Sequence, residues 1–332
     1  MFSGKKVAAA CLAVAAGSAA GLGPAGVASA QTGGPVSYTY KTVTIPGAAR
    51  SELNGVNARG AYAGDALNSN YLGIRLFVAN PAGRLTFYQL PFKDIATTHP
   101  FYESASGMDN AGDVVGAWTD TSGRSHGFER MANGKISAIN DPSASDASNA
   151  GTLVEGMSPD GTVIAGGYYD SNLAPHGFLL KGGKFTTHDV PGATGTVLTF
   201  DNRETYGGYY VSAAGGVFGF YVQNGKLHTV AAPGEANPPA GFGTELIGMR
   251  ADGTLYGDVF PAGAPAHAFS LADGTFSVIN DPKEVGTTDL DGTAINCASA
   301  TGVVVGGYTY TAGTPTVGGL VTAFIATPRT SS

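Results

Sequence analysis

The fold is decided by a stretch between Gly156 and Pro191, which reads GMSPDGTVIAGGYYDSNLAPHGFLLKGGKFTTHDVP. The stretch from Gly107 to Pro142 has nearly the same pattern, GMDNAGDVVGAWTDTSGRSHGFERMANGKISAINDP. A third copy runs from Gly248 to Pro282 and reads GMRADGTLYGDVFPAGAPAHAFSLADGTFSVINDP. Weaker copies occupy 55–91 and 200–233. Copies spaced by about 50 residues are typical of β-propellers and solenoids.

Each copy predicts four short β-strands. Runs rich in Val, Ile, Phe, Tyr and Thr are separated by turns such as Asp160-Gly161 after the first run and Asn133-Gly134 after the third. Asn-Gly and Asp-Gly between β-type runs indicate hairpins. Four antiparallel strands make one propeller blade.

A sixth copy is split between the two ends of the chain. It begins at Ile295 and stops after its third run, at Pro328, while YKTVTIPGA at 40–48 matches KFTTHDVPGA at 184–193. A strand contributed by the other terminus closes a ring and removes an exposed sheet edge. We therefore predict an all-β, six-bladed β-propeller with an N-terminal strand closing the last blade, in preference to a β-sandwich. The predicted blades are 50–91, 104–142, 153–191, 198–233, 245–282, and 294–328 completed by 38–46.

The first 30 residues predict a secretory signal peptide. Lys5 and Lys6 precede an apolar run, and Ala28-Ser29-Ala30 is a small-residue cleavage site. No later run reaches the length needed to span a membrane. We expect a secreted, extracellular monomer with a single propeller at 31–328 and a short tail at 329–332.

Charge and cysteine content exclude some classes of protein. The chain carries 18 Lys and Arg against 25 Asp and Glu, a net charge of −7, and it has no basic cluster. Nucleic acid is not expected as a partner, because phosphate binding needs clustered cations. Cys297 is the one cysteine after the predicted signal peptide, so an intramolecular disulfide is not expected. Its apolar neighbours predict a buried small residue.

His267-Ala268-Phe269 and the two HGF triplets at 126–128 and 176–178 occupy one position of the repeat. On these residues, and on the V-V-G run before them and the PGA ending after them, the chain resembles the extracellular HAF-repeat family of secreted bacterial proteins. Blades one, four and six depart from the pattern, for example with RLF at 75–77. The resemblance implies a propeller and export, and it implies no particular activity, since one fold hosts many functions.

The repeated histidines and aromatic residues each permit two interpretations. His126, His176 and His267 recur in equivalent positions, which predicts a repeated structural bond rather than a metal site. Aromatic residues also recur two positions after a glycine. They predict packing between blades or, alternatively, a rim of aromatic faces that stacks on sugars. These aromatic residues are Trp118, Tyr168, Tyr209 and Tyr308.

Four glutamates, Glu52, Glu103, Glu155 and Glu245, lie just before or within the first strand of a blade, the strand that lines the channel. Carboxylates around one axis repel one another unless a cation, a basic ligand or a proton relieves them. They predict a ligand site at the channel mouth, with Arg50 and Arg203 offsetting part of the charge, or else solvated loop acids. No cofactor is required, and calcium would suit such a mouth because it takes oxygen ligands.

Three functions remain open. The first is binding of a glycan or another small molecule at the loop-bearing mouth, by Glu52, Glu245, Arg50 and the four aromatic residues. The second is a hydrolase or lyase, for which His99, Tyr102, Glu103 and Glu155 are the candidate catalytic residues. His99 and Glu103 belong to an irregular connection at 92–104 and have the chemistry of an acid/base pair. The third is a protein-binding scaffold.

Overall fold

The computed structural model describes residues 36–68, 73–96, 103–286, 288, 291–311 and 320–329. Within these residues the regular elements are all β-strands. The described residues contain no helix long and apolar enough to cross a membrane. The predicted signal peptide, His99 and Tyr102 lie outside the described residues.

The strands of the described residues form two four-stranded and two eight-stranded sheets. A single parallel pair joins the halves of each eight-stranded sheet, at Gly151/Ser125 and at Gly243/Val217. We number the antiparallel four-stranded units as blades one to six. Blade one contains β2 (Ala48–Val56), β3 (Tyr62–Asn68), β4 (Ile74–Ala79) and β5 (Leu85–Tyr88). Blade two contains β6 (Glu103–Met108), β7 (Val114–Thr119), β8 (Ser125–Arg130) and β9 (Ile136–Ile139). Blade three contains β10 (Gly151–Met157), β11 (Val163–Tyr169), β12 (Pro175–Lys181) and β13 (Lys184–Thr187).

The remaining blades follow the same order along the chain. Blade four contains β14 (Gly195–Asn202), β15 (Thr205–Val211), β16 (Val217–Gln223) and β17 (Lys226–Val230). Blade five contains β18 (Gly243–Met249), β19 (Leu255–Phe260), β20 (His267–Ala272) and β21 (Thr275–Val278). Blade six contains β22 (Thr293–Ala298), β23 (Val304–Thr311), β24 (Leu320–Pro328) and β1 (Tyr38–Val43).

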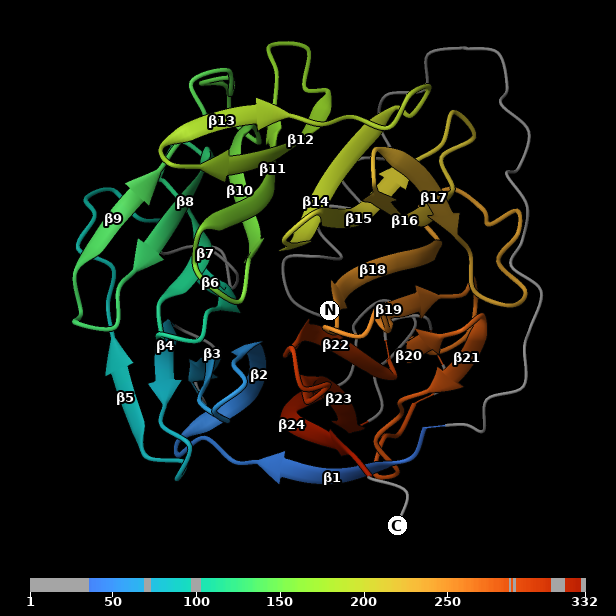
Figure 1. The fold of residues 1–332 in the computed structure, drawn as a ribbon. Helices are drawn as coiled ribbons and strands as arrows, with labels where there is room; N and C mark the ends of the chain where they lie inside the picture. The colour runs from blue at the N-terminus through green and yellow to red at the C-terminus, as the bar shows by residue number, and fades with distance from the viewer. Residues whose placement is uncertain are drawn as a thin grey trace.

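The N-terminal strand completes the C-terminal blade, as the split repeat predicts. β1 pairs antiparallel with β24, from Tyr38 opposite Pro328 to Val43 opposite Ala323. In Figure 1 the blue β1 runs along the outer edge of the red blade and continues into blade one. The two ends of the described chain are thereby held in one sheet.

The first strand of each blade faces a common axis, around which the blades are arranged (Figure 1). Each of these inner strands contacts the inner strand of the next blade, and β22 contacts β2. Two buried hydrogen bonds join neighbouring inner strands at the same register. Thr199 Oγ1 donates to the Leu246 carbonyl over 2.7 Å, and Asn296 Nδ2 donates to the Leu53 carbonyl over 3.2 Å. The second bond links blade six to blade one.

The repeated glycine and phenylalanine of the motif explain each other. Phe128 and Phe178 lie on the third strands and are fully buried. A Cβ on Gly116 would lie 2.7 Å from the Phe128 ring, and one on Gly166 would lie 2.8 Å from the Phe178 ring. The second strand therefore needs glycine where the phenylalanine of the third strand crosses it, which gives the V-V-G and H-G-F pattern.

Candidate functional site

A pocket lies on the ring axis, at the ends of the inner strands that lead into the first turn of each blade. All six inner strands contribute to its lining, and its cavity volume is about 40 Å³. We call it the axial pocket. One position from each blade defines it: Val56, Met108, Met157, Asp201, Met249 and Ala298.

A bulge in every inner strand fixes this position. The ladder to the second strand shifts by one residue at Val154/Gly156 in blade three and at Leu198/Phe200 in blade four. The second residue after the shift occupies the same position in each blade, so Met157 of blade three is equivalent to Asp201 of blade four. Five blades put an apolar side chain there, and blade four puts a carboxyl group.

Blade four also differs in its first turn. The other blades have five residues between the first and second strands, such as 158–162 in blade three. In blade four β14 and β15 extend further and leave only Arg203 and Glu204 between them. Arg203 has a φ of +64°, a left-handed conformation that two-residue hairpins require. The repeat is therefore broken beside the position that carries Asp201.

Asp201 is 5% exposed, although it is ionisable. Burial raises the pKa of its carboxyl to about 6. The positive charge of Lys181 and a hydrogen bond from the Arg203 N–H lower this pKa, and the negative charge of Asp160 raises it. Among the described residues, Asp201 forms no ion pair. A carboxylate in this place needs a proton or a cation, because an unpaired buried charge is costly.

The four predicted glutamates lie at three different levels and do not form one ring. Glu52 and Glu245 precede the bulge of their strands by two residues, and Glu103 precedes it by three. Glu155 is the bulged residue itself. None of the four lines the axial pocket, which opens at the other end of the axis from the predicted mouth. Sequence spacing could not reveal these levels, because the bulge shifts the register.

Two of the glutamates face an aspartate on the neighbouring strand. Glu52 lies opposite Asp65 and Glu245 lies opposite Asp258. Arg50 forms an ion pair with Glu52 at 2.5 Å, and Asn54 donates to Asp65 over 2.5 Å. Burial, together with the Glu52 charge, raises the pKa of Asp65 well above its usual value. These acids are part of the blade interior.

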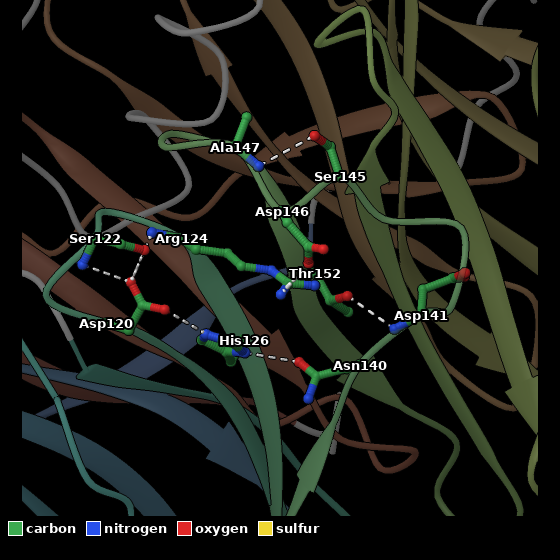
Figure 2. Close-up of polar contacts among 10 residues, drawn as sticks. All are labelled: Asp120, Ser122, Arg124, His126, Asn140, Asp141, Ser145, Asp146, Ala147 and Thr152. Carbon is green, nitrogen blue, oxygen red and sulfur yellow. Dashed lines mark hydrogen bonds and ion pairs between the residues drawn. The ribbon is translucent and has the colours of Figure 1, made fainter.

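Glu103 occupies a position where four blades carry threonine. Each threonine hydroxyl accepts a backbone N–H from the chain that arrives from the preceding blade, as between Asp141 and Thr152 at 2.9 Å in Figure 2. Burial raises the pKa of Glu103 to about 7. Glu103 lies opposite Trp118 in the β6/β7 pair of blade two, which follows the irregular 92–104 connection. The four threonines are Thr152, Thr196, Thr244 and Thr293.

The repeated aromatic residues pack within the blades and do not form a rim. Trp118, Tyr168 and Tyr308 are 7%, 7% and 3% exposed, and each pairs with the residue three before the bulge. The assignment of Tyr209 to this set is wrong, because Tyr210 holds the equivalent register. A one-residue slip reverses the face of a strand, so Tyr209 is fully buried, near enough to Glu245 and Glu155 for their charges to raise its pKa further.

The prediction that the repeated histidines make a structural bond is confirmed. His126 lies 2.8 Å from Asn140 Oδ1 and 3.0 Å from Asp120 Oδ2, and so ties the third strand to the chain on either side (Figure 2). Its ring stacks on Trp118 at a centroid distance of 4.3 Å. His176 repeats the pattern with Asp189 at 2.7 Å and Tyr168 at 5.1 Å.

In the described part of the chain, no group of three or more His, Cys, Asp or Glu side chains is placed to hold a metal ion. Cys297 has no disulfide and lines the axial pocket, half-buried, with its Sγ 4.0 Å from the Val56 carbonyl. Sequence reasoning overlooked the pocket itself. The available signal was the shortened blade-four turn, where the four residues NRET separate Asp201 from its partner Tyr206, while the six residues SPDGTV separate Met157 from its partner Ile164.

No protein-family model matches the chain, and no curated protein matches it in sequence. Solved structures resemble it in fold. A fungal lectin from Aleuria aurantia, described as a six-bladed β-propeller, is 13% identical over 78% of this chain and 88% of the lectin, with a TM-score of 0.46. A putative TolB from Agrobacterium tumefaciens is 12% identical over 85% and 90% of the two chains, also with a TM-score of 0.46. At these identities and TM-scores the similarities carry no argument about function.

Proposed function

We propose that this protein is a secreted, six-bladed β-propeller that binds a small ligand in its axial pocket. The observation that carries the proposal is the pocket itself, which lies on the axis and draws lining residues from all six inner strands. The cycle of inner-strand contacts supports a closed ring. Pockets that collect side chains and backbone groups from several elements are the usual place for a small ligand.

A single axial ligand fits the molecule better than multivalent sugar binding. A lectin with one site per blade would repeat exposed aromatic residues, and here the repeated Trp118, Tyr168 and Tyr308 are buried. A glycan remains a candidate as one ligand on the axis, together with other compact polar molecules.

The test is to block the pocket. Ala58 lines it from the exposed first turn of blade one, and Ala251 is an exposed alanine in the matching turn of blade five outside the lining. A panel of sugars and small polar metabolites is screened by thermal shift and calorimetry. We expect Ala58→Trp to abolish binding of any ligand found and Ala251→Trp to preserve it. Equal binding by both variants would place the ligand elsewhere and contradict the proposal.

A second function, as a hydrolase or lyase, is favoured by one observation. Burial raises the pKa of Glu103 to about 7, which suits a general acid at neutral pH. In this alternative His99 and Tyr102, which lie outside the described residues, are the further candidate catalytic residues. A panel of polysaccharides is assayed with the wild-type protein and Glu103→Gln. Turnover that falls at least a hundredfold in the variant, with binding at the axial pocket intact, supports the enzyme; turnover that is unchanged removes Glu103 from the mechanism.

A further inference from the structure

We propose that the axial pocket binds a protonated amine, with Asp201 as its counter-charge. This inference rests on the proposed function, because it names the ligand chemistry of the same pocket. It goes further in assigning one residue, which no repeated feature of the chain predicts, as the group that selects the ligand.

One position of the ring differs chemically between blade four and the other blades. Val56, Met108, Met157, Met249 and Ala298 stand where blade four has Asp201. At neutral pH, above its pKa of about 6, the carboxyl is largely ionised, although only 5% of the residue is exposed. A buried carboxylate is retained where a cation or strong donors compensate it.

The protein's own groups compensate this carboxylate only in part, because the pKa of Asp201 stays raised by burial although Lys181 and the Arg203 N–H lower it. Lys181 is an exposed residue at the end of β12, and it attracts Asp201 without forming an ion pair among the described residues. Asp160, in the first turn of blade three, adds a second negative charge nearby. Lys181 outweighs Asp160 in this balance, but burial outweighs both, so a cation that enters from the pocket would complete the compensation of the carboxylate.

The remaining lining of the pocket suits an organic cation. Three methionines contribute to the pocket, and their thioethers are polarizable and adaptable in shape. Phe200 also contributes to the lining, and its side chain packs with Leu246, Leu255 and Phe269. The inner strands pair with a second strand on one side, and in the described residues near the pocket no strand pairs with their axial edge. The carbonyl groups of Leu53, Val56 and Leu246 already accept side-chain donors of a neighbouring blade, so only other carbonyl groups of that edge could accept the N–H groups of an ammonium that Asp201 does not use.

The methionines also provide the test. Protein labelled with carbon-13 at the methionine methyl groups is titrated with n-propylammonium chloride, and with 1-propanol as the neutral analogue. Met108, Met157 and Met249 report on the pocket, and Met131 lies outside its lining and serves as the internal reference. We expect saturable shifts of the three pocket signals with the amine, weak or absent shifts with the alcohol, and no shift of Met131.

Two variants separate the charge of Asp201 from the charge of the face as a whole. Asp201→Asn should weaken amine binding at least tenfold. Asp252→Asn removes an acid from the first turn of blade five, outside the pocket lining, and should leave binding within a factor of two. Equal weakening by both variants would assign the effect to general electrostatics and overturn the inference.

Other outcomes distinguish this inference from the proposed function. If amine and alcohol shift the pocket methionines equally and Asp201→Asn has no effect, the pocket binds ligands without the charge, and only the inference fails. If calcium chloride produces the same saturable shifts as the amine, the site takes an inorganic cation, and again only the inference fails. If neither the amine, the alcohol nor any compound of the small-molecule panel perturbs the three signals, both fail.

Discussion

The two ends of the ring axis differ in how far they follow the repeat. At the end where the chain enters each inner strand, threonine hydroxyls and histidine rings repeat the same bonds in several blades. At the end where the inner strands turn back, the axial pocket contains one position that breaks the pattern, Asp201. The difference teaches that repeated polar residues in this molecule hold the blades together, and that ligand chemistry is found where the repeat fails.

The largest effect on stability is expected from opening the ring, because both ends of the axis depend on a closed ring. Deleting residues 31–48 removes β1 with the buried Tyr38, Val43 and Ile45, and exposes the edge of β24. Burial of each large apolar side chain contributes about 1.5–3 kcal/mol. We expect loss of cooperative urea unfolding, or aggregation. A control chain that begins at Val36 should unfold as the full chain does; unchanged unfolding of the deletion variant would contradict the closed ring.

The second prediction compares the pH dependence of stability for two acids, Glu103 at one end of the axis and Asp201 at the other. The native pKa of Glu103 is raised from 4.5 to about 7, so its burial destabilises the fold increasingly as pH rises through that interval. Glu103→Gln should therefore be more stable than wild type at pH 8, by about 2 kcal/mol, with no gain below pH 4.5. Asp201→Asn should show its gain at lower pH, between 3.8 and about 6.

Urea unfolding between pH 4 and 8 measures both variants. Only Asp201→Asn should also lose amine binding, which is the distinction between the two ends. A pH-independent difference for both variants would show that neither carboxyl titrates in the expected interval.

The third prediction concerns the threonine bonds. Thr244 is fully buried, and its hydroxyl accepts the Ala232 N–H over 2.9 Å. Thr244→Val leaves that N–H without an acceptor and should lower the free energy of unfolding by about 1–3 kcal/mol. Thr244→Ser keeps the hydroxyl and serves as the control. Equal losses in the two variants would assign the effect to packing rather than to the hydrogen bond.

The smallest effect is expected at the repeated histidines. His176 contacts Asp189 and stacks on Tyr168, but its side chain is 27% exposed. His176→Ala should therefore cost about 1 kcal/mol of stability, while ligand binding at the axial pocket stays unchanged. A loss of binding without a loss of stability would give this end of the axis a functional role and remove the contrast.

Much of the fold follows from the sequence, because local turn chemistry and strand length repeat in it. Turn dipeptides such as Asn133-Gly134 and Asn224-Gly225 mark the hairpins, and 40–48 supplies the strand missing after Pro328. The error at Tyr209 has a local cause. The chain reads Tyr-Gly-Gly-Tyr-Tyr there, so either glycine can be aligned with the repeat. The ladder chooses Gly208, which lies opposite Leu198.

The candidate site was less predictable from the sequence. It depends on the register of the strands and on which end of the axis each residue occupies. Glu52, Glu103 and Glu155 lie near the same point of their blades in sequence, and the bulge distributes them over three levels. Asp201 has no repeated counterpart, so an alignment of the copies passes over it. Its significance appears only when the other five blades are seen to place apolar residues at the same position of the pocket.

The most direct measurement is a crystal structure of the protein soaked with n-propylammonium chloride, with 1-propanol as the matched soak. We predict density for the amine on the axis, with its nitrogen within hydrogen-bonding distance of the Asp201 carboxylate and its alkyl group against the pocket methionines. Density at the opposite end, beside Glu103, or an axial pocket that stays without either compound at saturating concentration, would contradict it.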